Sequence, residues 1–298
     1  MWIVAALTLG TLLSCSQSEP DPAGMKLVFE DQDAGRLAIC GPDGGKPDYL
    51  TPDSLQARGP VTDSGRTTVY FIAKSRSQPE ALAAAFSIHV DGTGLRQLAH
   101  LPLSVLDLQI TPNGSMLLFL GKYPDQEYVR AYRLSVGDSA FQAVTPDTKS
   151  VHDPAMAPGG LNFVWHDGSQ SDTLFVSSLQ SFLTLPIFPF AYTQVSLSWP
   201  HGQSFAAVCG PNRHGLCFNL LQDDKGEEVR RESVLIPESE GLEISQPAFH
   251  PDGVRILYVE TESADPRPSR LCVIDRNSLK ITRIPLECRR PAHPAWVR

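Results

Sequence analysis

The sequence has 298 residues, of which 42% are hydrophobic and 19% are charged, and its formal net charge is −8 at pH 7. This length and apolar content allow one large repeat domain or two ordinary domains, and they exclude a disordered or coiled-coil chain. The acidic balance argues against nucleic acid and anionic membrane surfaces as partners. The 25 prolines and 22 glycines indicate many turns.

The N-terminus has the pattern of an export signal. Residues 2–13 form an apolar run that is too short to span a bilayer. The run ends in Leu12-Leu13-Ser14-Cys15, which resembles the lipobox of bacterial lipoproteins, although no Lys or Arg precedes it. The resemblance implies a signal peptide over residues 1–14 and lipidation of Cys15, and Ser16 after it favours the outer membrane. A buried N-terminal strand with an ordinary cysteine is the alternative.

Residues 15–24 are polar and rich in proline, so we expect a flexible tether between the lipidated Cys15 and a folded domain over residues 25–298.

That domain repeats one motif: an apolar strand, a tight turn that ends in glycine, and a second apolar strand. The clearest copy is His250-Pro251-Asp252-Gly253 between two apolar segments. Glycine accepts positive φ and aspartate bonds its own backbone, so both suit such a turn. The turn glycines recur at intervals of 42 to 51 residues: Gly65, Gly114, Gly160, Gly202 and Gly253. Other copies replace His250 and Asp252, so we expect those two side chains to be dispensable.

A period of this length, built of strands and turns, is typical of a propeller. Each repeat continues with two further short strands, which gives four antiparallel strands per blade. The C-terminal Pro294-Ala295-Trp296 matches Pro247-Ala248-Phe249, whereas Met25–Phe29 lacks a preceding inner strand. We therefore predict an all-β, six-bladed propeller in which the C-terminal strand joins blade one and removes an open sheet edge.

The sequence contains six cysteines: Cys15, Cys40, Cys209, Cys217, Cys272 and Cys288. Cys209 and Cys217 flank a turn-rich connection between two apolar runs, so we expect them on adjacent antiparallel strands of an exported protein. This placement predicts a disulfide, with two free buried thiols as the alternative. For Cys40 a core position is favoured, and Cys272 with Cys288 is a further pairing to test.

Polar residues are predicted around one mouth of the central channel. Counting seven residues back from each turn glycine gives Arg58, Asp107, Asp153, Val195 and Gln246, and the matching C-terminal residue is His293. Such a ring predicts a site for a ligand or peptide partner. The alternative is that loops beside a wet channel are polar for solvation alone.

Two further groups of residues are candidate sites. The pairs His152-Asp153 and His166-Asp167 have metal-ligand chemistry, but we expect them on different loops at opposite strand ends, as solvated turns. Phe188, Phe190 and Tyr192 lie in an apolar stretch without a glycine turn. They form a candidate partner patch, although packing over a blade edge is favoured.

No nucleophile elbow or paired-cysteine motif occurs, so we expect no catalytic residue, no metal and no cofactor. Asp107 with Asp153 is the remaining carboxylate pair that a propeller glycosidase would need.

The combined repeat, apolar-x-x-Pro-Asp-Gly followed by strand–Asp-Gly–strand–Leu-Thr, resembles that of TolB, the periplasmic Tol–Pal component, over residues 25–298. TolB carries a separate N-terminal α/β domain, and here a tether precedes the propeller. The resemblance implies that the propeller binds an envelope protein or peptide. With the lipobox-like segment and the acidic charge, we expect a monomeric, lipid-anchored envelope protein of a Gram-negative bacterium that binds no nucleic acid. The alternatives are a propeller enzyme acting on a glycan or peptide, with or without a metal, and a scaffold of a larger complex.

Overall fold

All regular elements in the described part of the chain are β-strands. The computed structural model describes residues 24–101, 103–138, 140–157, 160–167, 173–189, 194–201, 204–210, 216–222, 228–236, 241–262 and 268–298. Blade 1 comprises β24 (Pro291–Val297), β1 (Lys26–Asp31), β2 (Arg36–Gly41) and β3 (Gly44–Tyr49). Blade 2 comprises β4 (Leu55–Thr62), β5 (Thr68–Ser75), β6 (Ala84–His89) and β7 (Arg96–His100). Blade 3 comprises β8 (Ser104–Ile110), β9 (Met116–Lys122), β10 (Arg130–Ser135) and β11 (Phe141–Ala143). Blade 4 comprises β12 (Val151–Met156), β13 (Asn162–Asp167), β14 (Thr173–Ser178) and β15 (Thr184–Pro189). Blade 5 comprises β16 (Gln194–His201), β17 (Ser204–Gly210), β18 (Leu216–Gln222) and β19 (Glu228–Ile236). Blade 6 comprises β20 (Leu242–Phe249), β21 (Arg255–Glu262), β22 (Ser269–Asp275) and β23 (Lys280–Arg283).

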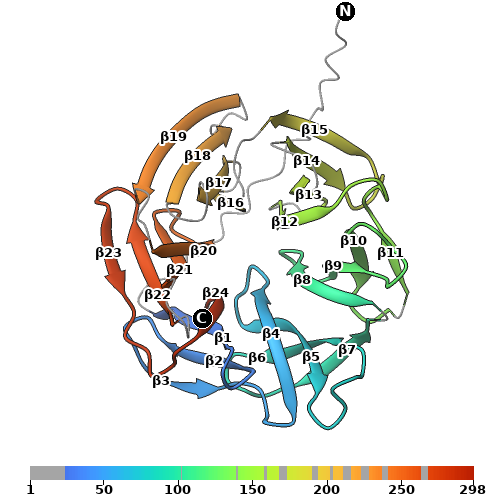
Figure 1. Ribbon diagram of the computed structural model, residues 1–298, viewed down its shortest axis with the longest axis horizontal. Helices are drawn as coiled ribbons and strands as arrows, with labels where there is room; N and C mark the ends of the chain where they lie inside the picture. The colour runs from blue at the N-terminus through green and yellow to red at the C-terminus, as the bar shows by residue number, and fades with distance from the viewer. Residues whose placement is uncertain are drawn as a thin grey trace, which may run out of the picture.

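The strands form six sheets of four strands, arranged around a common centre (Figure 1). In each sheet the strands follow chain order from the centre outward, starting with β4, β8, β12, β16 and β20, while β24 is the inner strand of blade 1. The prediction of an all-β propeller with four-stranded antiparallel blades is confirmed.

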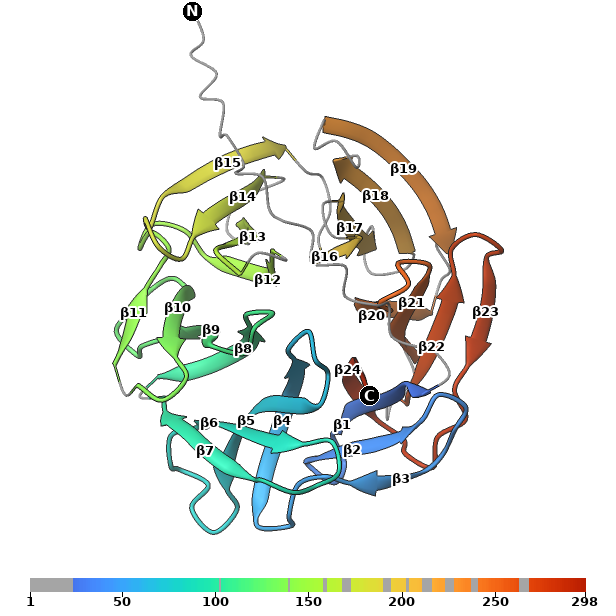
Figure 2. The ribbon, with the colours of Figure 1, turned by 180° about the vertical axis from the view of Figure 1, so that it is seen from behind.

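The C-terminal strand closes the ring as the sequence predicted. β24 pairs antiparallel with β1, with Leu27 opposite Trp296 and Val28 opposite Ala295, and Figure 2 shows the two strands side by side from behind. The first and last parts of the chain therefore share one sheet, in which β24 covers the inner edge of β1.

The core lies mainly between neighbouring blades. One buried cluster joins Ile72 of blade 2 to Leu108 and Phe119 of blade 3, and another joins Phe29 of blade 1 to Leu257 of blade 6. The second strand of a blade has apolar side chains on both faces because each face meets another blade, as the buried residues Ile256, Leu257, Tyr258 and Val259 of β21 show.

The expectation that His250 and Asp252 are dispensable is wrong. His250 is buried and its ring packs edge-on against Trp296, with centroids 4.5 Å apart. Its Nδ1 lies 2.9 Å from Oδ2 of Asp252, which also accepts a 2.7 Å hydrogen bond from Nε of Arg255. Burial opposes ionisation of Asp252, but bonds from Arg255 and Val254 hold its pKa at about 2. This network connects the turn to the closing strand.

Three cysteines are free thiols. Cys40 and Cys272 are buried and Cys288 is partly buried, so the Cys272–Cys288 pairing is wrong. Burial raises the pKa of Cys40 to about 11 and those of Cys272 and Cys288 to about 12, which makes them inert as nucleophiles.

Some predicted features fall outside the described residues, namely Cys15, Phe190 and Tyr192. Phe188 lies in β15, the outermost strand of blade 4. In the part of the chain that the structure describes, no helix is long and apolar enough to cross a membrane.

Candidate functional site at the channel mouth

The inner strands share a β-bulge at the predicted channel-mouth positions. In β12, β20 and β24, two residues stand opposite one residue of the neighbouring strand. The first residue of each bulge has left-handed φ: 46° for Asp153, 53° for Gln246 and 46° for His293. Each is followed by a proline, which has no N–H to leave unpaired in a bulge.

Left-handed φ is uncommon outside glycine and costs about 1–3 kcal/mol where structure enforces it. Three polar residues hold this conformation at equivalent positions around one channel. Strain of this kind tends to persist at functional sites.

In blade 2 the equivalent position is Gly59, and the assignment of Arg58 to the ring is wrong by one residue. Gly59 has φ 59° and lies in the matching bulge between Arg58 and Val61. The count failed because the left-handed turn residue of this blade is Arg66, with φ 55°, instead of Gly65. Seven residues before Arg66 is Gly59.

Gln246 and His293 come together with Glu30 across the junction of blades 6 and 1. The backbone N–H of His293 donates to Oε1 of Gln246 at 2.6 Å, which orients the amide so that its Nε2 lies 3.2 Å from Nε2 of His293. An amide nitrogen only donates, so Nε2 of His293 accepts and Nδ1 carries the proton. Nδ1 then donates to Oε2 of Glu30 at 3.0 Å, and the same oxygen accepts from the N–H of Gly59 at 3.3 Å.

Asp107 occupies the ring position of blade 3. Its side chain is half-buried and accepts a 2.7 Å hydrogen bond from the N–H of Leu108. Burial raises its pKa, opposed by hydrogen bonds from the N–H of Leu108 and from the side chain of Gln109.

The prediction that His152-Asp153 and His166-Asp167 lie at opposite strand ends is also wrong. β12 and β13 are antiparallel, so the start of one meets the end of the other, and His152 is directly opposite His166. Oδ2 of Asp153 lies 4.0 Å from Nδ1 of His166, and Lys149 pairs with Asp167 at 3.1 Å. Burial lowers the pKa of His152, opposed by Asp167. Asp153 therefore contacts its own blade.

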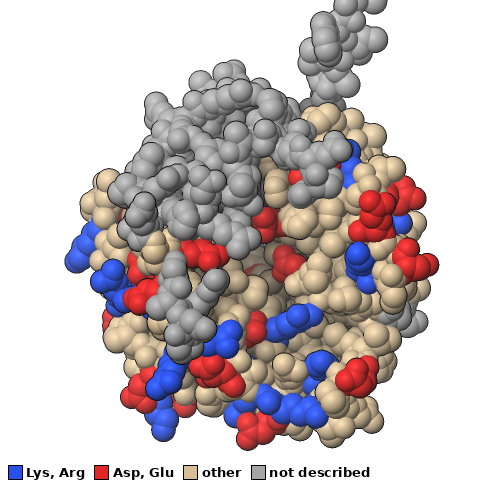
Figure 3. Space-filling view, in the orientation of Figure 1, with Lys and Arg blue, Asp and Glu red and all other residues tan. Residues whose placement is uncertain are grey.

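Two of the ring positions, Asp107 and Asp153, are acidic, and Glu30 adjoins the ring. Figure 3 shows acidic side chains beside the hollow at the centre of the molecule. The arrangement offers hydrogen-bond acceptors, a neutral imidazole and an amide, which suits polar recognition of a partner chain. Within the described ranges, no group of three or more His, Cys, Asp or Glu side chains is arranged to hold a metal ion.

Sequence reasoning missed Glu30 and Gly59. Glu30 directly follows the apolar residues Leu27, Val28 and Phe29 of β1, and its side chain is 13% exposed. That position was the available signal, because a buried charge needs a partner. The partner, His293, is more than 260 residues away, and only the ring closure brings the two together.

No protein-family model matches the sequence, and no curated protein matches it. Solved structures do resemble the fold. TolB from Acinetobacter baumannii matches with a TM-score of 0.68 at 15% identity, over 92% of this chain and 66% of that one. A chain of the nidogen/laminin complex matches at 12% identity, with a TM-score of 0.67 and coverage of 92% and 99%.

A puromycin-hydrolysing peptidase of Mycobacterium tuberculosis matches with a TM-score of 0.59 at 16% identity, over 87% of this chain and 43% of that one. The enzyme alternative therefore stays a hypothesis. At these identities the likeness shows the fold alone. The resemblance to TolB that the repeats predicted is confirmed at that level: this chain has a TolB-like propeller.

Proposed function

We propose that this chain is a non-catalytic envelope lipoprotein whose propeller binds a protein or peptide partner at the channel mouth. The observation that carries the proposal is the set of strained residues Asp153, Gln246 and His293 at equivalent bulges. Solvation alone would not require left-handed φ, since unstrained residues are equally well hydrated. A binding site, by contrast, needs polar groups held in a fixed orientation toward the partner, and a strained backbone can hold them so.

The comparisons support this function at the level of the fold. One neighbour is TolB, and another is a chain of a complex between nidogen and laminin. The second of these is a structure of a protein complex, which supports a protein partner for the propeller of this chain.

The test begins with crosslinking in whole cell envelopes and mass spectrometry, to identify the partner. Capture of that partner by purified protein is then compared with capture by the variant Asp107→Asn/His293→Asn. Asp107→Asn keeps the size of the side chain, His293→Asn removes the imidazole, and asparagine accepts the left-handed φ of residue 293. We expect affinity to fall about tenfold or more, because hydrogen bonds to charged groups contribute about 1.5–3 kcal/mol.

The matched control is Asp43→Asn/His100→Asn, which makes the same exchanges at two exposed positions. Asp43 lies in the turn between β2 and β3, and His100 is the last residue of the outer strand β7. It should capture the partner like the unmodified chain. Equal capture by the ring variant and the control would show that the partner binds elsewhere.

For the anchor, we predict that Cys15→Ser moves the protein from the membrane fraction to the soluble fraction. The proposal rests on the lipobox-like Leu12–Cys15 segment, because a thiol at that position is the group that would carry the lipid. Cell fractionation with immunodetection measures the shift, and Cys288→Ser is the control. Membrane retention of Cys15→Ser would contradict lipidation at that residue.

Export to the periplasmic side of the outer membrane, a monomeric state and a Cys209–Cys217 disulfide belong to the same proposal. The disulfide is supported by the strand register, in which Cys209 and Cys217 are directly opposite each other on β17 and β18. A cross-strand position of this kind brings two Cβ atoms into the range that a disulfide needs.

A further inference from the structure

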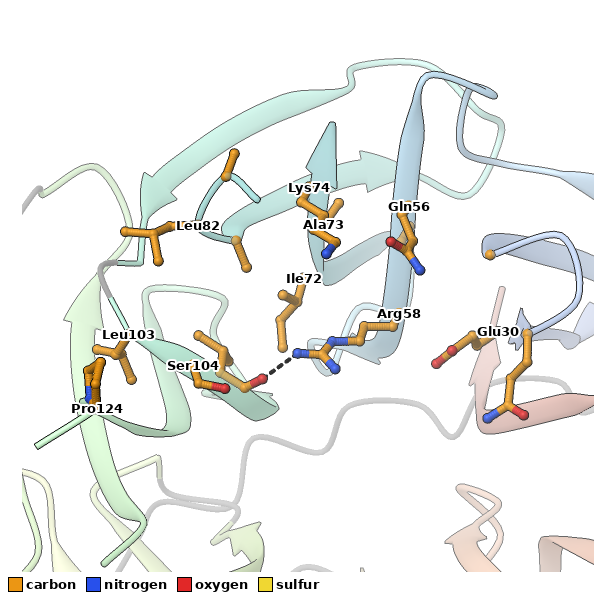
Figure 4. Close-up of a pocket in the computed structure, with 16 residues that line it drawn as sticks. Glu30, Gln56, Arg58, Ile72, Ala73, Lys74, Leu82, Leu103, Ser104 and Pro124 are labelled. Carbon is orange, nitrogen blue, oxygen red and sulfur yellow. Dashed lines mark hydrogen bonds between the residues drawn. The ribbon is translucent and has the colours of Figure 1, made fainter. Parts of the chain in front are cut away.

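A cavity of about 460 Å³ lies beside the channel mouth, between blades 1, 2 and 3 (Figure 4). Its volume is within the range of pockets that hold small organic groups. Arg58 points into it from β4, and Glu30 lies at the side toward the channel. The cavity is contiguous with the ring, because Arg58 precedes Gly59 and Glu30 bonds both Gly59 and His293.

The cavity carries a surplus of positive charge. Arg58 uses one Nη2 donor on the backbone oxygen of Val105, and Lys74 donates to the backbone oxygen of Pro79 at 2.8 Å. Neither cation has an ion pair with a carboxylate in the described part of the chain. Glu30 is the one acid among the described lining residues, and its Oε2 already accepts two hydrogen bonds.

The positive charge of this cavity contrasts with the net negative charge of the whole chain. The chain has 33 acidic residues and 25 Lys and Arg residues, so an average basic side chain has acids nearby. Two cations without acidic partners in one cavity favour an anionic ligand, and a guanidinium with free donors is suited to the two oxygens of a carboxylate.

Much of the remaining wall is apolar, alongside the polar side chains of Gln32, Gln56 and Ser104. Ile72 and Leu103 are each 2% exposed and form buried wall, whereas Leu82 is 58% exposed at the rim. An exposed leucine at the edge of a pocket offers contact area to a ligand, because its burial on binding is favourable. The ligand therefore combines a carboxylate with an apolar group.

We propose that this cavity binds the free C-terminus of a peptide chain, with the terminal carboxylate at Arg58 and an apolar last side chain between Leu82, Ile72 and Leu103. The proposal rests on the proposed function, since the peptide is the end of the partner. A peptide is favoured over a small free acid because the cavity continues into the polar ring, which can take the residues that precede the terminus.

The test uses two pools of hexapeptides with five random positions and Leu, Ile, Val or Phe as the last residue. One pool has a free carboxylate and the other a C-terminal amide. Retention on immobilised protein is measured by mass spectrometry, and selected peptides are titrated by fluorescence anisotropy. We expect the free acids to bind at least tenfold more tightly than the amides, and Arg58→Gln to remove that difference.

Arg96→Gln is the matched control, because Arg96 is exposed and lies on the outer strand of the same blade. Leu82→Ser should weaken acid and amide binding alike, since it removes apolar contact only. Equal retention of acids and amides by the unmodified protein would overturn the proposal. So would octanoate binding as tightly as the selected peptides with the same dependence on Arg58, because the ligand would then be a small free carboxylate.

The proposed ring site and the proposed cavity site can each be contradicted without contradicting the other. If Asp107→Asn/His293→Asn loses the partner while acids and amides bind equally, the C-terminal site is wrong and the ring stands. If Arg58→Gln removes carboxylate selectivity while the ring variant captures the partner normally, the ring is wrong and the cavity stands.

Discussion

Replacing Trp296 with alanine is expected to lower the free energy of unfolding by about 3–5 kcal/mol, the range for large aromatic residues in cores. Trp296 is 5% exposed, packs with Leu27 and Leu257 in the cluster between blades 6 and 1, and has His250 edge-on against its ring. It also lies on β24, the strand that closes the ring. Its loss therefore opens a cavity and weakens the attachment of β24, the one strand of blade 1 that comes from the far end of the sequence.

Urea unfolding followed by circular dichroism measures this effect. Nε1 of Trp296 is buried and makes no hydrogen bond within the described structure, so Trp296→Phe should recover much of the stability. Ile281→Ala, on the exposed outer strand β23, is the control and should change stability by less than about 1 kcal/mol. A loss below that value for Trp296→Ala would mean that the closing strand is held mainly by its backbone.

The propeller was predictable because its signals are local. Each inner hairpin needs a left-handed residue at a fixed place in its turn, and Gly114, Gly160 and Gly253 all provide it, with φ between 66° and 70°. The same rule explains the error in blade 2. There Arg66 adopts the left-handed conformation, and an arginine in such a position has no distinctive sequence signal.

The site was less predictable because it depends on contacts between distant segments. Counting from the turn glycines singled out Asp107, Asp153, Gln246 and His293, which the structure places within the inner strands β8, β12, β20 and β24, but it did not reveal their partners. Glu30 meets His293 only after ring closure. His152 and His166 were misplaced because their pairing depends on the register of β12 against β13.

The second large effect is expected at a buried carboxylate in blade 6. Glu260 is 3% exposed, and its Oε2 lies 3.6 Å from Nε of Arg270 and 3.5 Å from Nε of Arg283. Its Oε1 accepts a 3.1 Å hydrogen bond from the hydroxyl of Tyr258. The two guanidinium groups thus neutralise a charge that the fold has removed from water.

We therefore expect the double variant Arg270→Ala/Arg283→Ala to lose about 3–5 kcal/mol, because breaking a buried ion pair leaves an uncompensated charge. Adding Glu260→Gln should restore most of that loss, since a neutral amide keeps the shape and can still accept from Tyr258.

The control is Glu262→Gln, which removes the more exposed ion pair of the same Arg270 and should cost less than about 1 kcal/mol. Urea titration of all four proteins measures the stabilities. If Glu260→Gln fails to rescue the double variant, the arginines stabilise the blade by packing of their side-chain stems over β21 and β22, and charge compensation is not the reason for their presence. Rescue would instead identify Glu260 as a buried charge that the sheet tolerates only because β22 and β23 each bring an arginine to it.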